Sequence, residues 1–363
     1  MPGGKTPRAV GKGQPERSEP GHPLGIHRVL DTTPRLQQAA ERLDNTLPIY
    51  SNEILIAVER LNIDAASFVQ MEKETSGNAN RIGEIVLRNT RERGKQHNRV
   101  TGSGGMLVGT VEQIGSQYRG PLKCKKGERI ASLISLTLTP LQLEAIERIH
   151  LATHQVDVKG HAVLFESSIA APLPKDIPEK VAMAVFDVAG APATVDGLAP
   201  KGNKTLLVIG GGGKAGLLSC VAGRRKMGRG AKIVAIEPNP NAARALEGLG
   251  VCDEILLVDA TDPIAVRSGV EKATRGKMAD IVINVASVPD TEIGSILSAK
   301  NSGKIVFFSM ATSFTKVALG AEGVASHATL IFGNGYYPNH GKFALDLLRK
   351  HKPLRELFLQ RYQ

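Results

Sequence analysis

The chain has 363 residues, of which 42% are hydrophobic, and it carries a formal net charge of +11. This length exceeds what one hydrophobic core usually covers, so we expect two domains. No run of about 20 apolar residues predicts a membrane span. Three scattered cysteines, Cys124, Cys220 and Cys252, exclude a disulfide framework and a cysteine-rich zinc site.

Residues 1–24 predict a disordered extension. They are rich in glycine, proline and mixed charge, and they lack the apolar core of a secretory signal. Together with the low cysteine content, this favours a soluble protein of the reducing cytoplasm.

Residues 25–178 predict a β-rich first domain. Short apolar segments, "NEILIAVERLNI", "RIGEIVL", "GMLVGTVEQIG" and "ERIASLISLTL", are separated there by Gly, Asn and Lys clusters. The basic run "LRNTRERGKQHNR" raises the question of nucleic-acid binding. With 4% aromatic residues and no tryptophan there are few stacking platforms, so we expect no nucleic-acid partner. An anionic cofactor or substrate is the simpler use of these charges.

Residues 179–337 predict a doubly wound parallel sheet. From Lys204 onward, continuous apolar runs such as "KTLLVIG", "AKIVAIE" and "ADIVINVA" alternate with helical segments. Strands of this kind are buried by helices on both faces of a parallel sheet. The closing residues 338–363 are expected to return to the first domain.

The segment "LLVIGGGGKAGLLS" contains the pattern GxGxxG at Gly211, Gly213 and Gly216. It follows a predicted strand, opens a predicted helix, and precedes by 21 residues an acidic residue, Glu237, at the end of the next strand. In this setting the first glycine allows a tight turn, the second admits a pyrophosphate and the third lets helix and sheet pack closely. Because Glu237 would bind the ribose hydroxyls and repel a 2′-phosphate, the pattern favours NAD over NADP; Arg244, one turn further, could soften this preference.

Other residues at the carboxyl ends of the predicted strands are expected to line the same cofactor site. Asp259 has two interpretations, as part of an adenine pocket or as the cap of the following helix. The remaining expected cofactor residues are Gly212, Lys214, Ala215, Asn284, Val285 and Ser309.

The order of domains resembles the medium-chain dehydrogenase/reductase superfamily. "MLVGTVEQIG" is similar to its glycine-bearing strand and "LKCKKGERI" to its characteristic turn. The resemblance implies a GroES-like barrel before a Rossmann domain, and a homodimer. The positions of the superfamily's zinc ligands fall here on Asp64, Gly105 and Met106, which implies a branch that binds no metal.

Longer matches resemble one family, the L-erythro-3,5-diaminohexanoate dehydrogenases. They are "RLDNTLPIYSNEILIAVERLNIDAASF", "RGKQHN", "TGSGGMLVGTV", "FFSMATSF", "ALGAEGV" and "GNGYYPNH". The resemblance implies NAD-dependent oxidative deamination of a diamino acid at C3 in lysine fermentation. Arg99 stands where the family has proline, which adds charge beside the expected site.

Such a reaction needs a base, an anion for an ammonium group and a cation for the carboxylate. Asp64 is the candidate ammonium partner, or else a turn aspartate that caps a local helix. Lys95 or Arg93 would bind the carboxylate, or else belong to a solvated loop. His97 is the candidate proton shuttle, or an incidental loop histidine. Asn98 and Ser103 complete the expected substrate contacts.

Two other functions fit the same pattern. A zinc-free quinone or enoyl reductase of the superfamily would have similar domains, although a basic residue in place of Glu237 would be its sign. A non-catalytic nucleotide-binding or RNA-binding protein is the alternative from another class.

Overall fold

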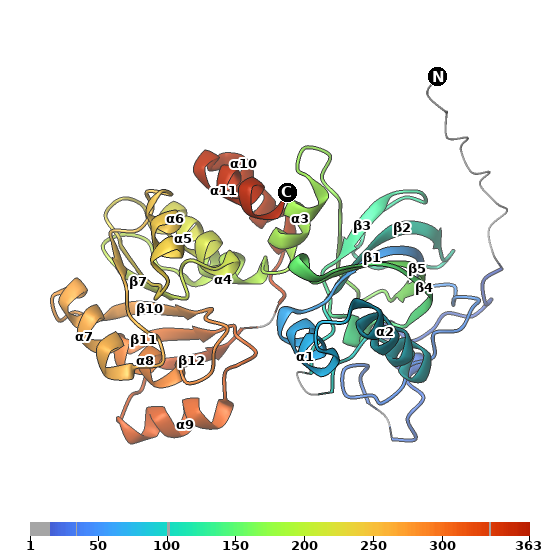
Figure 1. Ribbon diagram of the computed structural model, residues 1–363, viewed down its shortest axis with the longest axis horizontal. Coiled ribbons are helices and arrows are strands. Elements are labelled where there is room, and N and C mark those ends of the chain that lie inside the picture. The colour runs from blue at the N-terminus through green and yellow to red at the C-terminus, as the bar shows by residue number, and fades with distance from the viewer. Residues whose placement is uncertain (1–14, 34, 100–101, 334) are drawn as a thin grey trace. The chain divides into compact units, whose positions relative to one another are not determined.

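The computed structural model describes residues 15–33, 35–99, 102–333 and 335–363. The chain divides into two compact units, residues 1–173 and 174–363, which are described separately (Figure 1). Unit 1 contains an antiparallel sheet with two helices, and unit 2 contains a parallel sheet with helices on both faces.

Unit 1 is built on a six-stranded sheet in the order β4-β5-β1-β2-β3-β6. The central strand β1 pairs antiparallel with both β2 and β5, and register shifts interrupt both pairings near Val58. Such bulges bend a sheet and allow it to curl around its own core. The strand bounds are Ile54–Asn62 (β1), Met106–Ile114 (β2), Arg129–Ser132 (β3), Leu141–His150 (β4), Gln155–Leu164 (β5) and Ala170–Pro172 (β6).

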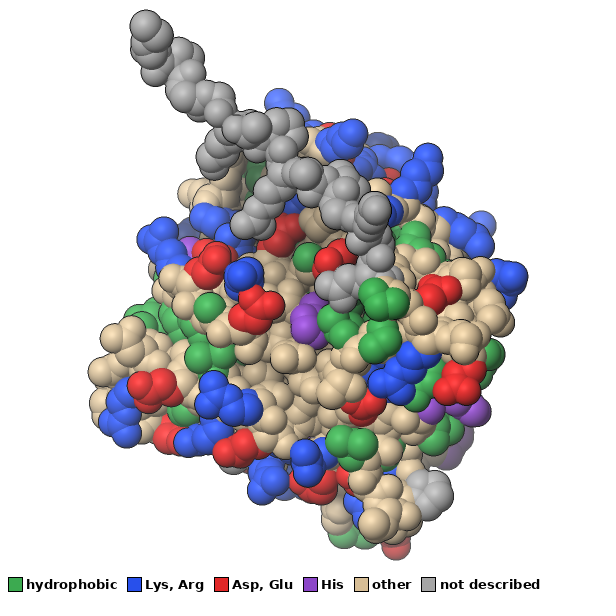
Figure 2. Space-filling model, turned by 90° about the vertical axis from the view of Figure 1, so that its right-hand side faces the viewer, with side chains coloured by type: hydrophobic (Ala, Val, Ile, Leu, Met, Phe, Trp, Pro, Cys, Tyr) green, Lys and Arg blue, Asp and Glu red, His purple; other side chains and the backbone are tan. Residues whose placement is uncertain are grey.

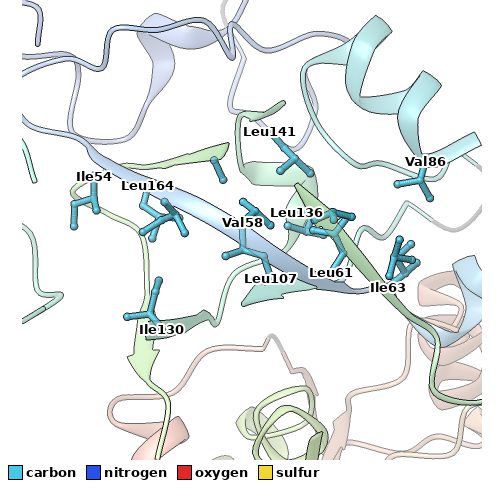
Figure 3. Packing of buried hydrophobic residues seen from close by; sticks show 14 of the residues in the cluster. Ile54, Val58, Leu61, Ile63, Val86, Leu107, Ile130, Leu136, Leu141 and Leu164 are labelled. Carbon is cyan, nitrogen blue, oxygen red and sulfur yellow. The ribbon is translucent and has the colours of Figure 1, made fainter. Parts of the chain in front are cut away.

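The core of unit 1 lies between this sheet and its helices (Figure 3). Ile54, Val58 and Leu61 of β1 pack with Leu107 of β2 and with side chains from the other strands. Burial of each large aliphatic side chain contributes about 1.5–3 kcal/mol to folding.

The segment "RIGEIVL" was expected to be a strand, and this prediction is wrong. It lies in helix α2, Ala79–Arg93, which follows helix α1, Ala65–Thr75. The side chain of Asn78 accepts a hydrogen bond from the Arg81 amide and caps α2, and the helix buries Ile82, Val86 and Thr90. These residues are four apart, which is the spacing of one helix face.

The N-terminal segment is more ordered than its composition predicts. Residues 1–14 lie outside the described part of the chain, but residues 15–24 form hydrogen bonds with other parts of unit 1. The Arg17 amide donates to the carbonyl of Ile49, and its guanidinium donates to the Tyr50 hydroxyl at 2.7 Å. Further along, the fully buried Arg28 donates to both oxygens of Glu53, at 2.7 and 2.6 Å. These long-range contacts hold a segment that has few apolar residues of its own.

Unit 2 contains the predicted doubly wound sheet. Its six parallel strands follow the order β12-β11-β10-β7-β8-β9, so the chain starts in the middle, moves outward to β9 and then crosses back to β10. Ligands of such sheets bind where this direction reverses, here at the carboxyl ends of β7 and β10. The strand bounds are Thr205–Ile209 (β7), Lys232–Ile236 (β8), Glu254–Leu256 (β9), Ala279–Asn284 (β10), Ala299–Phe307 (β11) and Thr329–Phe332 (β12).

Helices cover both faces of this sheet (Figure 1). Helices α4, α5 and α6 lie on one face, and α7, α8 and α9 lie on the other. Their bounds are Gly190–Leu198 (α4), Lys214–Met227 (α5), Pro240–Glu247 (α6), Pro263–Thr274 (α7), Glu292–Ser298 (α8) and Phe314–Gly323 (α9).

The last residues of the chain pack within unit 2. Helix α10, His340–Lys350, packs on α3, Glu179–Phe186, and on α4 and α5, while α11, Lys352–Tyr362, packs on α3. Arg349 also binds Asp176 through two hydrogen bonds of 2.8 Å. By their contacts, residues 174–178 and 338–363 belong to unit 2. The sequence analysis expected both stretches in the first domain.

No single helix among the described residues is long and apolar enough to cross a membrane. The pair α3 and α4 meets that test only jointly, by length and composition, with a bend of 50° between the two helices. Most of the side chains of this pair are buried in the core of the protein.

Candidate active site

The glycine turn after β7 lies at the reversal point of the sheet. Gly210 has a φ of 87°, in the left-handed region, and a Cβ there would lie 2.9 Å from the backbone of Ala286, just past β10. The amides of Gly210 and Gly211 both donate to the carbonyl of Ile236 at the end of β8. The turn is thus held between the carboxyl ends of three neighbouring strands, and α5 begins directly after it.

Gly213 and Gly216 are glycines for different physical reasons. A Cβ on Gly216 would lie 2.1 Å from the Gly210 carbonyl oxygen, so close packing of α5 on the turn requires glycine. Gly213 has an ordinary φ of −77°, and a Cβ there would meet only one atom, at 3.7 Å. It is exposed and precedes the first N–H groups of α5, which have no acceptor within the helix. The space beside Gly213 and these donors fit the phosphates of a dinucleotide.

Glu237 joins the turn to the end of β8. Its two carboxylate oxygens accept hydrogen bonds from the Gly212 and Asn239 amides, both at 3.0 Å, and the residue is 9% exposed. The side chain lies beside the glycine turn, as the spacing in the sequence predicts.

Four other expected cofactor residues also lie at the carboxyl edge of the sheet. Lys214 donates to Asp187 at 2.5 Å, and Ala215 lies half-buried in the first turn of α5. The Val285 amide donates to the carbonyl of Ile209, and the Ser309 hydroxyl accepts a hydrogen bond from the Ala311 amide.

Asp259 and Asn284 serve the protein itself. Asp259 binds the amide and hydroxyl of Thr261, and the cap of α7 is Asp262, so the interpretation of Asp259 as the helix cap is wrong. Asn284 is fully buried, and its amide donates to the Thr291 and Ser295 hydroxyls. Asn284 therefore holds the loop after β10 and has no exposed amide with which to bind a cofactor.

The structure adds Arg361, which the sequence analysis missed. Its guanidinium donates to the carbonyl of Gly212 at 3.0 Å from a position 149 residues further along the chain. Arg361 lies in α11, and no local pattern connects that helix with the glycine turn. The contact places a cation beside the proposed phosphate site.

A second group of polar residues lies in unit 1, around what we call the polar loop, residues 93–99 and 102–105. Asp64 precedes α1, and its carboxylate accepts a hydrogen bond from the Ser67 amide at 3.4 Å, as a capping residue does. A Cβ on Gly105 would lie 2.9 Å from the Asp64 nitrogen. Asp64 thus makes a contact of the kind that the capping interpretation expects, and the polar loop passes directly beside it.

Lys95 and Arg93 do not form a solvated loop. Lys95 is fully buried and donates to the Gln37 carbonyl at 2.6 Å, while Arg93 binds the carbonyl and carboxylate of Glu41. Burial, together with the nearby Arg93 charge, lowers the pKa of Lys95 to about 8. Burial and the charges of Lys95 and Arg93 lower the pKa of His97 to about 4, so His97 is neutral at pH 7.

Asn98 and Ser103 shape the loop. The Asn98 amide nitrogen of the backbone donates to the Ser103 carbonyl, and the side chain of Asn98 donates to Gln70 in α1 at 2.8 Å. These bonds bring the loop against α1. The basic run 87–99 accordingly does not form one exposed stripe, since Arg93 and Lys95 are buried. On the face drawn in Figure 2, Lys and Arg side chains are interspersed with Asp and Glu side chains.

Comparison with known proteins identifies the family. A model of the L-erythro-3,5-diaminohexanoate dehydrogenase N-terminal domain matches residues 27–174. A protein named L-erythro-3,5-diaminohexanoate dehydrogenase from Acetoanaerobium sticklandii is 42% identical over 342 residues, 94% of this chain and 99% of the relative. One of the same name from Fusobacterium nucleatum is 43% identical over the same shares. The chain belongs to the L-erythro-3,5-diaminohexanoate dehydrogenase family.

The fold of this family member is that of the medium-chain dehydrogenases. An alcohol dehydrogenase from Thermotoga maritima aligns with a TM-score of 0.54 at 14% identity, over 86% of this chain and 85% of that one. Unit 1 is thus a GroES-like domain and unit 2 a Rossmann domain, as predicted.

Two further observations concern metal ligands and charge in this chain. No group of three or more His, Cys, Asp or Glu side chains that could hold a metal ion occurs in the described part of the chain. Arg99 forms an ion pair of 3.1 Å with Glu41, the carboxylate that also binds Arg93. Arg99 is thus an exposed cation at the outer end of the polar loop.

Proposed function

We propose that this protein catalyses the NAD-dependent oxidative deamination of L-erythro-3,5-diaminohexanoate to 5-amino-3-oxohexanoate and ammonia, a step of lysine fermentation. The observation that carries the proposal is the identity of 42–43%, over 94% of the chain, to two proteins named for this activity. The glycine turn supplies the dinucleotide-binding element that the reaction requires.

The cofactor is NAD. A carboxylate at the end of the second strand accepts hydrogen bonds from ribose hydroxyls and repels a 2′-phosphate. Glu237 lies at this position, and its contact with the Gly212 amide fixes it beside the turn. Gly211, Gly212, Gly213 and the start of α5 bind the pyrophosphate, and Arg361 adds positive charge there. When bound, the nicotinamide accepts hydride from the substrate.

The substrate is an amino acid with two amines, and the residues of unit 1 match its charges. Asp64 binds an ammonium group, and its proposed role is compatible with its capping bond, since a carboxylate has several acceptor sites. His97 is the proposed proton shuttle; its lowered pKa of about 4 keeps the ring neutral at pH 7 but also makes it a weak base. Arg93 and Lys95 donate hydrogen bonds to protein carbonyls. They therefore attract the substrate carboxylate by long-range electrostatic attraction and not by direct contact. Asn98 and Ser103 hold the loop in shape.

The protein is a homodimer that pairs through β12. This strand is one of the two edges of the parallel sheet, the other being β9, and an edge strand has a row of backbone groups that a second copy can bind. Three large apolar side chains, Phe314, Leu319 and Phe332, are exposed on β12 and α9, and the rings of Phe314 and Phe332 are 5.5 Å apart. Sedimentation analysis of the wild type and of Phe332→Glu tests this, with a monomeric variant expected.

The test of function is reduction of NAD with 3,5-diaminohexanoate, followed by absorbance of NADH. Lysine and simple alcohols serve as control substrates, and NADP as the control cofactor. Oxidation of NADPH by quinones and enoyl thioesters tests the alternative reductase activity. An absorbance rise with the diamine alone supports the proposal, and no rise with it contradicts the substrate assignment without affecting the fold.

A further inference from the structure

The side chain of Gln96 is enclosed by protein but has no partner. Its exposed fraction is 0%, and neither Nε2 nor Oε1 forms a hydrogen bond with any residue that the structure describes. Folded proteins rarely leave a buried amide unpaired, because the lost bonds to water are not replaced. An unpaired amide in a native protein therefore calls for a ligand or a functional reason.

The backbones of Gln96 and of Asp64 both pack against the pair Gly104 and Gly105. A Cβ on Gly104 would lie 2.5 Å from the Gln96 carbonyl oxygen, and a Cβ on Gly105 would lie 2.9 Å from the Asp64 nitrogen. Two consecutive glycines thus separate the backbone of Gln96 from that of Asp64. Their lack of side chains allows this close approach.

The two sequence neighbours of Gln96, Lys95 and His97, differ in whether their polar groups already have hydrogen-bond partners. The Lys95 ammonium is bound to the Gln37 carbonyl at 2.6 Å. His97 Nδ1, in contrast, is buried and has no partner in the described part of the chain. Two consecutive residues of the loop, Gln96 and His97, therefore each hold a buried polar group without a partner among the described residues, while the Lys95 ammonium is bonded to the protein.

A primary amide suits a ligand that carries both signs of charge. Its Nε2 donates to a carboxylate, and its Oε1 accepts from an ammonium. In a β-amino acid these two groups are separated by one methylene, so a single amide can reach both. Because an amide does not titrate, it binds the amine without competing for its proton.

We infer that Gln96 is a substrate-binding residue whose side-chain amide binds the carboxylate and the 3-amino group of a β-amino acid. The inference rests on the proposed function for the identity of that substrate. It assigns the recognition of C1 and C3 to an uncharged residue and leaves Asp64 for an ammonium.

The test compares Gln96→Met with the wild type. Methionine has a similar length and no polar atoms, so it removes the amide without leaving a large cavity. If the amide serves the ligand, the KM for 3,5-diaminohexanoate rises about tenfold to a hundredfold. The melting temperature stays the same or rises, because a buried unpaired group is removed, and the Kd for NADH does not change.

The matched control is Gln37→Met. Gln37 is also buried, but its amide donates to the Leu24 carbonyl, so its loss should lower the melting temperature and leave the KM unchanged. A fall in melting temperature for Gln96→Met as large as that of the control, with an unchanged KM, would overturn the inference.

Calorimetry separates this inference from the proposed function. 3,5-Diaminohexanoate is titrated into the NADH-bound wild type and into NADH-bound Gln96→Met. Binding to the wild type that is weakened in the variant supports the inference even if no turnover is seen, in which case only the proposed reaction fails. Equal heats for both proteins, or no heat with the wild type, contradict it.

Discussion

The carboxylate of Glu237 and the amide of Gly212 are joined by a hydrogen bond of 3.0 Å, so the acidic residue is fixed against the turn that precedes α5. This bond leaves an anion where the adenosine ribose of a dinucleotide would lie. In the proposed NAD site, the choice between NAD and NADP would therefore depend on one side chain that the protein itself holds in position.

Replacing Glu237 should change this preference. In Glu237→Ser the repulsion of a 2′-phosphate is lost, and we expect the ratio of kcat/KM for NADP to that for NAD to rise about tenfold or more. Glu237→Gln keeps the size of the side chain and removes only its charge, so it separates repulsion from hydrogen bonding. An unchanged ratio in both variants would show that Glu237 does not select the cofactor.

Gly213 and Gly216 should respond in opposite ways to alanine. In Gly213→Ala the new methyl group meets no close atom, and we expect the free energy of unfolding to stay within about 1 kcal/mol. The same methyl group fills the space proposed for a phosphate, so the Kd for NADH should rise at least about tenfold. Thermal denaturation and fluorescence titration with NADH measure the two effects.

Gly216→Ala is the matched comparison. Its methyl group would lie 2.1 Å from the Gly210 carbonyl oxygen, so we expect a loss of about 1–3 kcal/mol of stability. If Gly213→Ala bound NADH as tightly as the wild type, the turn would not be the pyrophosphate site.

The fold of unit 2 could be predicted because its signals are local. Buried parallel strands read as apolar runs, and the turn between β7 and α5 shows its glycines within a few residues. In unit 1, α2 was missed because "RIGEIVL" also fits a short strand. The capping residue Asn78 and the four-residue spacing of Ile82, Val86 and Thr90 were the signals that could have found it.

The candidate site was less predictable because its contacts connect distant parts of the chain. The Lys95 ammonium donates to carbonyls that lie 57 and 58 residues earlier in the chain. The Arg361 guanidinium donates to the Gly212 carbonyl, 149 residues away. Neither partner can be read from the neighbouring sequence. A solvated loop therefore remained one interpretation of Lys95, and the sequence attached no role to Arg361.

Asp64→Asn should separate capping from chemistry. Asparagine caps a helix about as well as aspartate, so the melting temperature should change little. The loss of negative charge should weaken the interaction with an ammonium and lower kcat/KM for the diamine about a hundredfold, with the Kd for NADH unchanged. Asp262→Asn, which caps α7 through the Ile264 and Ala265 amides, is the control and should keep full turnover. Unchanged turnover in Asp64→Asn would remove Asp64 from the mechanism.

The buried pair of Arg28 and Glu53 should make the free energy of unfolding of unit 1 depend on pH. Burial alone would raise the pKa of Glu53, but hydrogen bonds from Arg28 and His27 outweigh this and lower it below its ordinary value of 4.5. The unfolded chain therefore binds more protons than the folded one below that value. The stabilisation is complete above about pH 4.5 and is lost as the pH falls through the lowered pKa.

Glu53→Gln should accordingly lose about 3 kcal/mol of stability at pH 7, since it removes the carboxylate 2.6 Å from the buried Arg28 guanidinium and leaves only the more distant Asp44 carboxylate, at 3.8 Å. The difference from the wild type should shrink as the pH falls below about 4.5, because the wild-type carboxylate is then protonated too. Urea denaturation between about pH 3 and about pH 7 measures this. Glu144→Gln, which removes an exposed ion pair with Lys159, is the control and should change stability little at any pH. A constant difference between the wild type and Glu53→Gln across this range would mean that the charge of Glu53 is not what holds the N-terminal segment.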